Sequence, residues 1–177
     1  PESDVAYIQD KGTLVVGITN FEPMDYQDEN GEWIGFDADM AKQFAEYLGV
    51  DVEFSEINWD YKVMELNAGN IDVVWNGMTI LPEVTSTMDV SNPYCLNAQV
   101  LVVPVDKAAD FEDLTSLEGL TVAVESGSAG EAAATALGAS TVAVAKQADT
   151  LLEVSAGTSD AAVIDLLMAG AMIGEGT

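Results

Sequence analysis

The sequence predicts an α/β protein with two lobes, each a mostly parallel sheet flanked by helices. Short β-branched runs alternate with helical patterns along the chain, which favours sheets covered by helices. A chain of 177 residues in which 49% are hydrophobic is long enough to bury one or two cores. Aromatic residues crowd the first half, and only Phe111 follows Tyr94. We therefore place a first lobe at residues 1–95 and a second lobe at residues 96–177.

The first half is predicted to run strand, helix, strand, helix, strand. After an irregular start at residues 1–11, the expected elements are a strand at 13–19, a helix from Phe36 that ends before Gly49, a strand at 50–57, a helix at 61–68 and a strand at 71–75. Asn30 and Gly31 form a hairpin-turn signal. Apart from Asp72, the strand at 71–75 is apolar, as in strands that are buried on both faces.

The first long helix carries an apolar stripe that predicts its buried face. The residues of this stripe recur at helical spacing: Phe36, Met40, Phe44, Tyr47 and Leu48. Acidic residues before the helix do not follow the order of a calcium-binding loop, because Tyr26 stands where its first Asp belongs. No metal site is expected there.

A short helix begun by Pro82 and a crossover lead into the second half, where the alternation resumes. The expected elements are a strand at 99–105, a brief helix at 115–118 with capping-box spacing, a strand at 121–124, a helix at 128–137, a strand at 141–145, a helix at 149–156, a strand at 161–164 and a helix at 166–173. The two halves share this architecture without a sequence repeat.

The composition excludes several classes of function. The net charge is −26, from 31 acidic residues and 5 lysines, so the surface repels nucleic acid and anionic lipid. Histidine is absent, which removes the commonest general base and most zinc sites. Cys95 is the only cysteine, so an intramolecular disulfide is impossible, and we expect it to be a small core residue. No apolar segment reaches the roughly 18 residues of a membrane span.

Polar and aromatic residues follow each predicted strand of the first half. Ligands of open α/β sheets bind beyond the carboxyl ends of the strands. The candidates at these positions are Asn20, Phe21, Trp59, Asn76, Gly77, Met78 and Thr79. Phe21 and Trp59 can hold an apolar or planar group between their rings, while Thr79 and nearby backbone bind polar ends. Phe21 and Trp59 can equally be ordinary core aromatics.

Two features follow strands of the second half. In the segment ESGSAGE at 125–131, Gly127 permits close backbone approach, and Ser128 with Glu131 has capping-box spacing. Amides at such a helix start can bind an anion, although the segment can equally be an ordinary helix start. Asp165 follows the last strand, where it can meet a ligand ammonium or cap the next helix.

Together these residues resemble one family. The motifs GTLVVG at 12–17 and GFDAD at 35–39, with Pro23 and Gly31, are similar to the amino-terminal signature of amino-acid-binding proteins of ABC importers, which have the type II periplasmic-binding-protein fold. The likeness continues through residues 59–60, 69–72, 76–80, 88–89, 91–94, 117–119, 122–124, 126–128 and 160–165.

The resemblance implies roles for the candidate residues. Phe21 and Trp59 match aromatics that sandwich the ligand side chain, and Asp165 matches the acid that pairs with its α-ammonium. The positions matched to the ligand carboxylate are Gly77 and Thr79 in the first lobe, and Ser128 with the neighbouring amides of Ser126, Gly127 and Ala129 in the second. We expect pocket walls to be formed by the residues next to Gly77 and Thr79 in the sequence, which are Trp75, Asn76 and Met78.

The family also implies a function. It predicts an extracytoplasmic protein that captures a small polar solute, above all an amino acid, in a cleft between lobes that close about a hinge at residues 91–99. It implies no catalysis, no cofactor and a monomeric state, with an ABC permease as partner. The expected location is the periplasm, or the outer face of the cell membrane as a lipoprotein, with the leader absent from this sequence.

The sequence departs from the family in two respects. Relatives usually carry an Arg for the ligand carboxylate where this chain has Val84. Lys62 or the amides at Ser128 and Ala129 could replace it, or the ligand could lack a carboxylate. Relatives also continue past the equivalent of Thr177 to complete the first lobe, so we expect a fragment that exposes apolar surface on that lobe.

Two other functions fit the same fold. A dehydratase-like enzyme would need a general acid, for which Glu22, Glu125 and Asp165 are candidates in a chain without histidine. A ligand-sensing domain of a receptor would be followed by a spanning helix and a signalling module.

Overall fold

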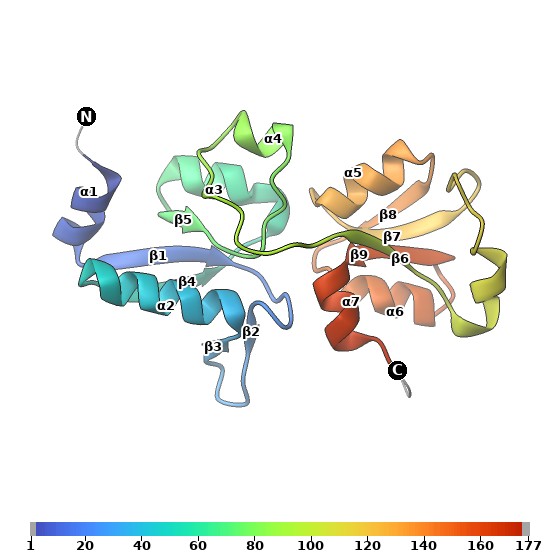
Figure 1. Ribbon diagram of the computed structural model, residues 1–177, viewed down its shortest axis with the longest axis horizontal. Helices are drawn as coiled ribbons and strands as arrows, with labels where there is room; N and C mark the ends of the chain where they lie inside the picture. Colours follow the sequence, from blue (N-terminus) through green and yellow to red (C-terminus); the bar gives the residue numbers. More distant parts are fainter. Residues whose placement is uncertain (1–2, 175–177) are drawn as a thin grey trace. The chain divides into compact units, whose positions relative to one another are not determined.

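Residues 3–174 are described by a computed structural model, in which the chain divides into two units, Pro1–Met78 and Thr79–Thr177. Each unit contains its own α/β sheet, which confirms the predicted fold class (Figure 1). The lobe boundary that we predict between residues 95 and 96 marks the hinge about which the lobes would close. It stays a prediction.

The first unit has a three-stranded parallel sheet in the order β4-β1-β5. Its elements are α1 (Asp4–Lys11), β1 (Thr13–Ile18), β2 (Tyr26–Gln27), β3 (Trp33–Ile34), α2 (Phe36–Leu48), β4 (Asp51–Glu56), the 3₁₀ helix η1 (Trp59–Tyr61), α3 (Lys62–Ala68) and β5 (Val73–Val74). The predicted hairpin forms between β2 and β3, and Asp28 accepts backbone hydrogen bonds from Asn30 and Glu32 within it.

The irregular start predicted for residues 1–11 is wrong over the part that the structure describes, because α1 occupies it. Ile8 anchors this helix in a cluster that covers one face of β1. The buried members of the cluster are Ile8, Leu14, Val16, Ala41, Ala45 and Leu48. A short helix with one buried apolar residue has little periodicity, so the sequence pattern did not reveal it.

Helix α2 forms as predicted, but it buries a different face. Its buried residues are Asp37, Ala38, Ala41, Ala45 and Leu48. The remainder of the predicted stripe is exposed, with Tyr47 at 85% of its reference area. Small alanine side chains let the helix approach the sheet closely, which larger residues at the same positions would prevent.

Strand β5 is shorter and less buried than predicted. Only Val73 and Val74 pair as a strand, and both are half-buried because β5 lies at the edge of the sheet. Ile71 is buried instead, with its side chain over Gly17, where an added Cβ would lie 2.5 Å from Ile71 Cδ1. The apolar residues at 71–75 therefore indicated that a strand forms, but not that it lies at the edge of its sheet.

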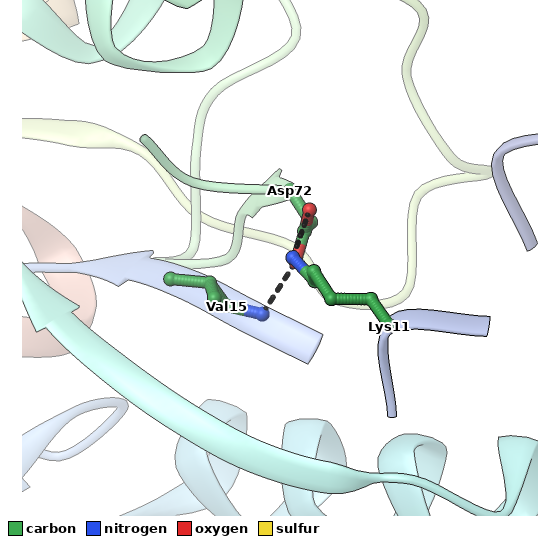
Figure 2. Close-up of polar contacts among 3 residues, drawn as sticks. All are labelled: Lys11, Val15 and Asp72. Carbon is green, nitrogen blue, oxygen red and sulfur yellow. Dashed lines mark hydrogen bonds and ion pairs between the residues drawn. The ribbon is translucent and has the colours of Figure 1, made fainter. Parts of the chain in front are cut away.

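Asp72 ties the start of β5 to β1 and α1 (Figure 2). Its Oδ2 accepts a hydrogen bond from the backbone amide of Val15 at 2.7 Å and an ion pair from Lys11 Nζ at 2.6 Å. The Asp72 side chain is nearly buried, whereas Lys11 is partly exposed. The bond to Val15 is therefore the better shielded of the two.

Replacing Asp72 by alanine should lower the free energy of unfolding by about 1–3 kcal/mol, because it leaves the Val15 amide without its acceptor. Replacing Lys11 by methionine should cost under about 1 kcal/mol, the usual scale of an exposed ion pair. Urea unfolding of both variants measures the two losses. Equal losses would show that the ion pair, and not the amide bond, carries the contact.

The second unit has a four-stranded sheet in the order β6-β9-β7-β8, parallel except for β6. Its elements are α4 (Pro82–Thr85), β6 (Gln99–Val102), the 3₁₀ helix η2 (Val105–Asp110), β7 (Thr121–Glu125), α5 (Ala129–Ala136), β8 (Ser140–Val144), α6 (Asp149–Ser155), β9 (Ala161–Asp165) and α7 (Leu166–Met172). Helix α5 covers one face of this sheet, and α6 and α7 cover the other (Figure 1).

Three predictions for the second unit are wrong. Residues 115–118 form no helix, because Ser116 Oγ accepts from the amide of Glu118 and donates to the Leu137 carbonyl, which favours a turn. The strand predicted to reach residue 105 ends at Val102. Cys95 is exposed, not in the core, because it lies in the irregular segment 91–98.

Across residues 3–174, none of the helices has the length and apolar character needed to cross a membrane.

Candidate functional site

The parallel sheet of the first unit brings several predicted residues to one edge. Strands β4, β1 and β5 run in the same direction, so their carboxyl ends lie together. Trp59 follows β4, Asn20 and Phe21 follow β1, and the segment 75–78 follows β5. The residues that follow the strands of this unit therefore lie at the same end of its sheet, as the sequence pattern predicted.

Asn76 joins the ends of β1 and β5. It is buried, its Oδ1 accepts from the Thr19 amide at 2.8 Å, and its Nδ2 donates to Thr19 Oγ1 at 2.6 Å. Both ends of the Asn76 amide are engaged by one residue. This favours a positioning role for Asn76, and its predicted place as a pocket wall stays a prediction.

Gly77 and Phe21 pack against each other at this edge. Phe21 is buried, and its turn is closed by two backbone bonds with Asp25, of 2.6 and 2.9 Å. Gly77 has φ of +59°, and an added Cβ would lie 2.8 Å from Phe21 Cε1. Glycine is required here both for the left-handed backbone and for the approach of the ring.

Replacing Gly77 by alanine should destabilise the protein more than replacing Gly69 does. Both residues have positive φ, so each substitution costs about 1–2 kcal/mol in backbone strain. A Cβ on Gly69 meets no atom within 4 Å, whereas one on Gly77 must displace Phe21. The difference between the two unfolding free energies isolates the Phe21 contact, and equal values would show that the ring moves without cost.

Trp59 carries a lysine over its ring. Lys62 Nζ lies 4.7 Å from the centroid of the Trp59 ring and donates to the Trp59 carbonyl at 3.1 Å. Both side chains are buried. The burial of Phe21 and Trp59 fits either predicted interpretation, as ligand clamps or as core aromatics.

The remaining candidates around this edge differ in their surroundings. Trp75 packs against the core cluster of the first unit, with its ring 5.8 Å from that of Phe44. Asn20 is exposed, and Met78 is half-buried. Thr79, also half-buried, falls in the second unit. None of these contacts decides a role in binding.

The loop after β7 forms the predicted helix start. Ser128 Oγ accepts from the Glu131 amide at 3.1 Å, and a Glu131 oxygen accepts from the Gly127 amide at 2.8 Å. These bonds fix residues Ser126, Gly127, Ser128 and Ala129 at the amino end of α5. Such an end carries partial positive charge and can hold an anion.

Asp165 stands at the end of β9, beside β7, and three side-chain amides hold its carboxylate. Gln99 donates to Oδ1 at 2.8 Å, Asn97 also donates to Oδ1, and Gln147 donates to Oδ2 at 2.8 Å. Gln147 also accepts from the Asp165 amide at 3.0 Å. Asp165 makes no side-chain bond that caps α7, so the capping interpretation is wrong.

No sequence pattern indicated that these three amides belong to the site. Gln99 lies opposite Asp165 in the antiparallel register of β6 and β9, and Gln147 follows β8. Only the strand order brings them together. Side chains directly opposite each other in an antiparallel pair are neighbours, so the pairing could have identified Gln99. This requires that the register of the two strands is already known.

The Asp165 carboxylate can accept one more hydrogen bond. Burial raises the pKa of Asp165 above its ordinary value, while hydrogen bonds from Gln147, Gln99 and Asn97 act to lower it. A carboxylate accepts about four hydrogen bonds, and these side chains supply three, all neutral. The remaining position, on Oδ2, suits a cationic donor.

Val84, at the position where the resemblance led us to expect an Arg, is buried on α4. Within residues 3–174 no group of three or more acidic or cysteine side chains is arranged to hold a metal ion.

The family model of bacterial extracellular solute-binding proteins, family 3, matches residues 14–166. The chain belongs to this family. The match covers both units and includes every predicted site residue from Asn20 to Asp165. For a family 3 protein, the edge of the sheet in each unit is therefore the place to look for ligand contacts.

Relatives of this family 3 protein include amino-acid binders. The L-cystine-binding protein TcyJ of Escherichia coli is 30% identical over 118 residues, which make up 66% of this chain and 44% of the relative. The chain therefore spans less than half the length of that curated relative.

Two solved structures are similar over most of the chain. The ancestral amino acid-binding protein AncCDT-1, a precursor of cyclohexadienyl dehydratase, has a TM-score of 0.88 and 37% identity, covering 96% of this chain and 77% of that one. The arginine-bound form of truncated ArgBP from T. maritima has a TM-score of 0.86 and 36% identity, covering 94% and 79%.

Proposed function

We propose that this protein binds an amino acid and delivers it to an ABC importer. The observation that carries the proposal is Asp165, a partly buried carboxylate whose three side-chain donors are neutral amides. An α-ammonium group would complete its hydrogen bonds and neutralise its charge. Relatives that bind cystine and arginine support the same ligand class.

The other ligand groups follow from the two sheet edges. At the start of α5, from Ser126 to Ala129, the Ser128 hydroxyl and the Ala129 amide are proposed to take the ligand carboxylate, because the amides of residues 126–128 already donate hydrogen bonds within the protein. With Val84 in place of an Arg, these two groups and the helix end would supply the main counter-charge, together with Gly77 and Thr79. Phe21 and Trp59 are proposed to contact the ligand side chain, and Trp75, Asn76 and Met78 to lie around it.

The cellular setting belongs to the proposal as well. The family is described as extracellular, which supports a location outside the cytoplasm. We propose the periplasm or, as a lipoprotein, the outer face of the cell membrane, with a permease as partner and a monomer that closes about residues 91–99. Catalysis and cofactors have no part in this function.

A ligand screen tests the proposal. Thermal-shift measurements with the common amino acids, cystine and simple amines should find at least one that raises the melting temperature, and calorimetry should then give micromolar or tighter binding, about 8 kcal/mol. If amines without a carboxylate bind as well as amino acids do, the site recognises the ammonium group and not the carboxylate. Failure of every compound would contradict the proposal.

A dehydratase is the second candidate, favoured by Glu125. This carboxylic acid is buried at the end of β7, directly before the loop at Ser126, and a similar structure is a precursor of cyclohexadienyl dehydratase. Replacing Glu125 by glutamine should then abolish turnover of a cyclic substrate while leaving binding intact. Absence of turnover by the unaltered protein would remove this candidate.

A further inference from the structure

The side chain of Gln99 extends from the Asp165 carboxylate to helix α5. Its Nε2 donates a hydrogen bond to Asp165 Oδ1 at 2.8 Å. The other end of the same amide, Oε1, lies 3.0 Å from the position that a Cβ on Gly130 would take. Gly130 is buried in the first turn of α5, which packs against β6 and β9. One amide therefore meets the candidate ammonium site at one end and α5 at the other.

The charge of Asp165 decides which end of the Gln99 amide faces it. An ionised carboxylate only accepts hydrogen bonds, so the N–H end of Gln99 must face Asp165 and its oxygen must face Gly130. Within residues 3–174 no group donates a hydrogen bond to Gln99 Oε1, although this oxygen is buried. The position of the amide thus depends on its bond to Asp165 and on its contact with α5.

Gln147 is held more firmly than Gln99. The Gln147 side chain is buried, donates to Asp165 Oδ2 at 2.8 Å and accepts from the Asp165 backbone amide at 3.0 Å. Both ends of the Gln147 amide are therefore fixed on Asp165, whereas Gln99 is fixed there by one end. Of the two glutamines, Gln99 is the one whose position a neighbouring side chain can change.

A side chain at residue 130 would meet Gln99 and the backbone of β9. Besides Gln99 Oε1, an added Cβ would lie 3.0 Å from the Val163 carbonyl oxygen and 3.3 Å from Val163 Cγ1. Val163 pairs with Leu101 of β6 inside the sheet, so its backbone has little freedom to move. The flexible Gln99 side chain must then give way. Gly130 has no positive φ, so space, and not backbone conformation, requires glycine here.

We propose that Gln99 is a positioning residue for Asp165 and that the absence of a side chain on Gly130 keeps Gln99 in place. The role in ligand binding rests on the proposed function, whereas the hold on the Asp165 carboxylate does not. A binding group acts best when neighbouring side chains fix it before the ligand arrives. Through Gln99, packing at the start of α5 sets the position of the acid proposed to meet the ligand ammonium.

Gly170 provides a matched control for Gly130. Both glycines lie within helices and neither has a positive φ, so replacing either by alanine favours the helix. A Cβ on Gly170 meets no atom within 4 Å. A difference between the two alanine variants therefore reports the contacts of residue 130, and not the gain in helix propensity.

The first arm of the test follows the Asp165 carboxyl by ¹³C NMR and needs no ligand. Burial raises the pKa of Asp165, and the hydrogen bond from Gln99 is one of those that act to lower it. Gln99→Met keeps the volume but removes the donor, so it should raise the titration midpoint of Asp165. Gly130→Ala should raise it as well, and Gly170→Ala should not. An unchanged midpoint in Gln99→Met or in Gly130→Ala would overturn the proposal.

The second arm measures binding by calorimetry, with L-arginine or whichever amino acid binds best in the screen as the probe. Gln99→Met should weaken binding about tenfold, the scale of a lost hydrogen bond to a charged group. Gly130→Ala should weaken it by up to about tenfold, since it displaces the same donor without removing it, and Gly170→Ala should leave it unchanged. In the double variant, Gly130→Ala should add no loss to that of Gln99→Met.

The double variant separates the proposal from a simple packing effect. Additive losses would show that residue 130 acts by moving α5, and would overturn positioning through Gln99. An affinity of Gly130→Ala equal to that of Gly170→Ala would overturn it too. If no amino acid binds while the Asp165 midpoint rises in Gln99→Met and Gly130→Ala, the proposed function fails and the positioning of Asp165 stands.

Discussion

Replacing Asp165 by asparagine is expected to weaken amino-acid binding by about 100-fold or more, or about 3 kcal/mol. The substitution removes the charge that meets the ligand ammonium. It also places an amide among three amide donors, Asn97, Gln99 and Gln147, so that at least one N–H group loses its acceptor. Calorimetry on the folded variant gives the loss.

A double-mutant cycle shows whether the ammonium itself is the partner. The best-binding amino acid and its analogue without the α-amino group are each titrated against both proteins. The analogue should bind weakly to the unaltered protein and should be almost insensitive to Asp165→Asn. The same loss for both ligands would place the effect in the fold of the site, and an affinity within threefold of the original would remove Asp165 from the site.

Raising the NaCl concentration from about 0.1 M to about 1 M is expected to stabilise the protein by about 5 kcal/mol, or 10–20 °C in melting temperature. The net charge of −26 makes the folded chain repel itself, and compaction brings the charges closer together than in the unfolded chain. Salt shortens the Debye length from about 10 Å to about 3 Å over this range, which removes most of that repulsion.

Guanidinium chloride separates screening from other effects of salt. At low concentration its ions screen charge as NaCl does, whereas its denaturing action grows with concentration. The melting temperature should therefore first rise and then fall. KCl should match NaCl throughout. A melting temperature that does not change with NaCl would show that the acidic residues are spaced too widely to repel one another.

The candidate site could be predicted in part because its residues follow strands. Phe21, Trp59 and Asp165 each come within a few residues of a strand end, and within each sheet the parallel strands align their carboxyl ends. The amide partners of Asp165 could not be predicted in this way. Gln99 lies 66 residues from Asp165 along the chain, and only the antiparallel pairing of β6 with β9 places it opposite.

Long elements were predicted more reliably than faces and short elements. Helix α2 and strand β1 show clear periodicity, and Gly49 ends the helix in the left-handed conformation that glycine favours. The buried face of α2 was misjudged because all of its large apolar side chains except Leu48 are exposed, while its alanines pack against the sheet. Size of side chain, not only polarity, decided which face could approach.

The sequence by itself determined the alternation of strands and helices, the family signature and the strongly acidic charge of this protein. These depend on spacing within about ten residues or on composition alone. The tertiary structure decided that Asp25 and Asp37 are both fully buried, and that Asp165 is held by three amides from two separate segments, residues 97–99 and Gln147. Such contacts depend on strand order and on how closely a helix approaches a sheet, which no local pattern encodes.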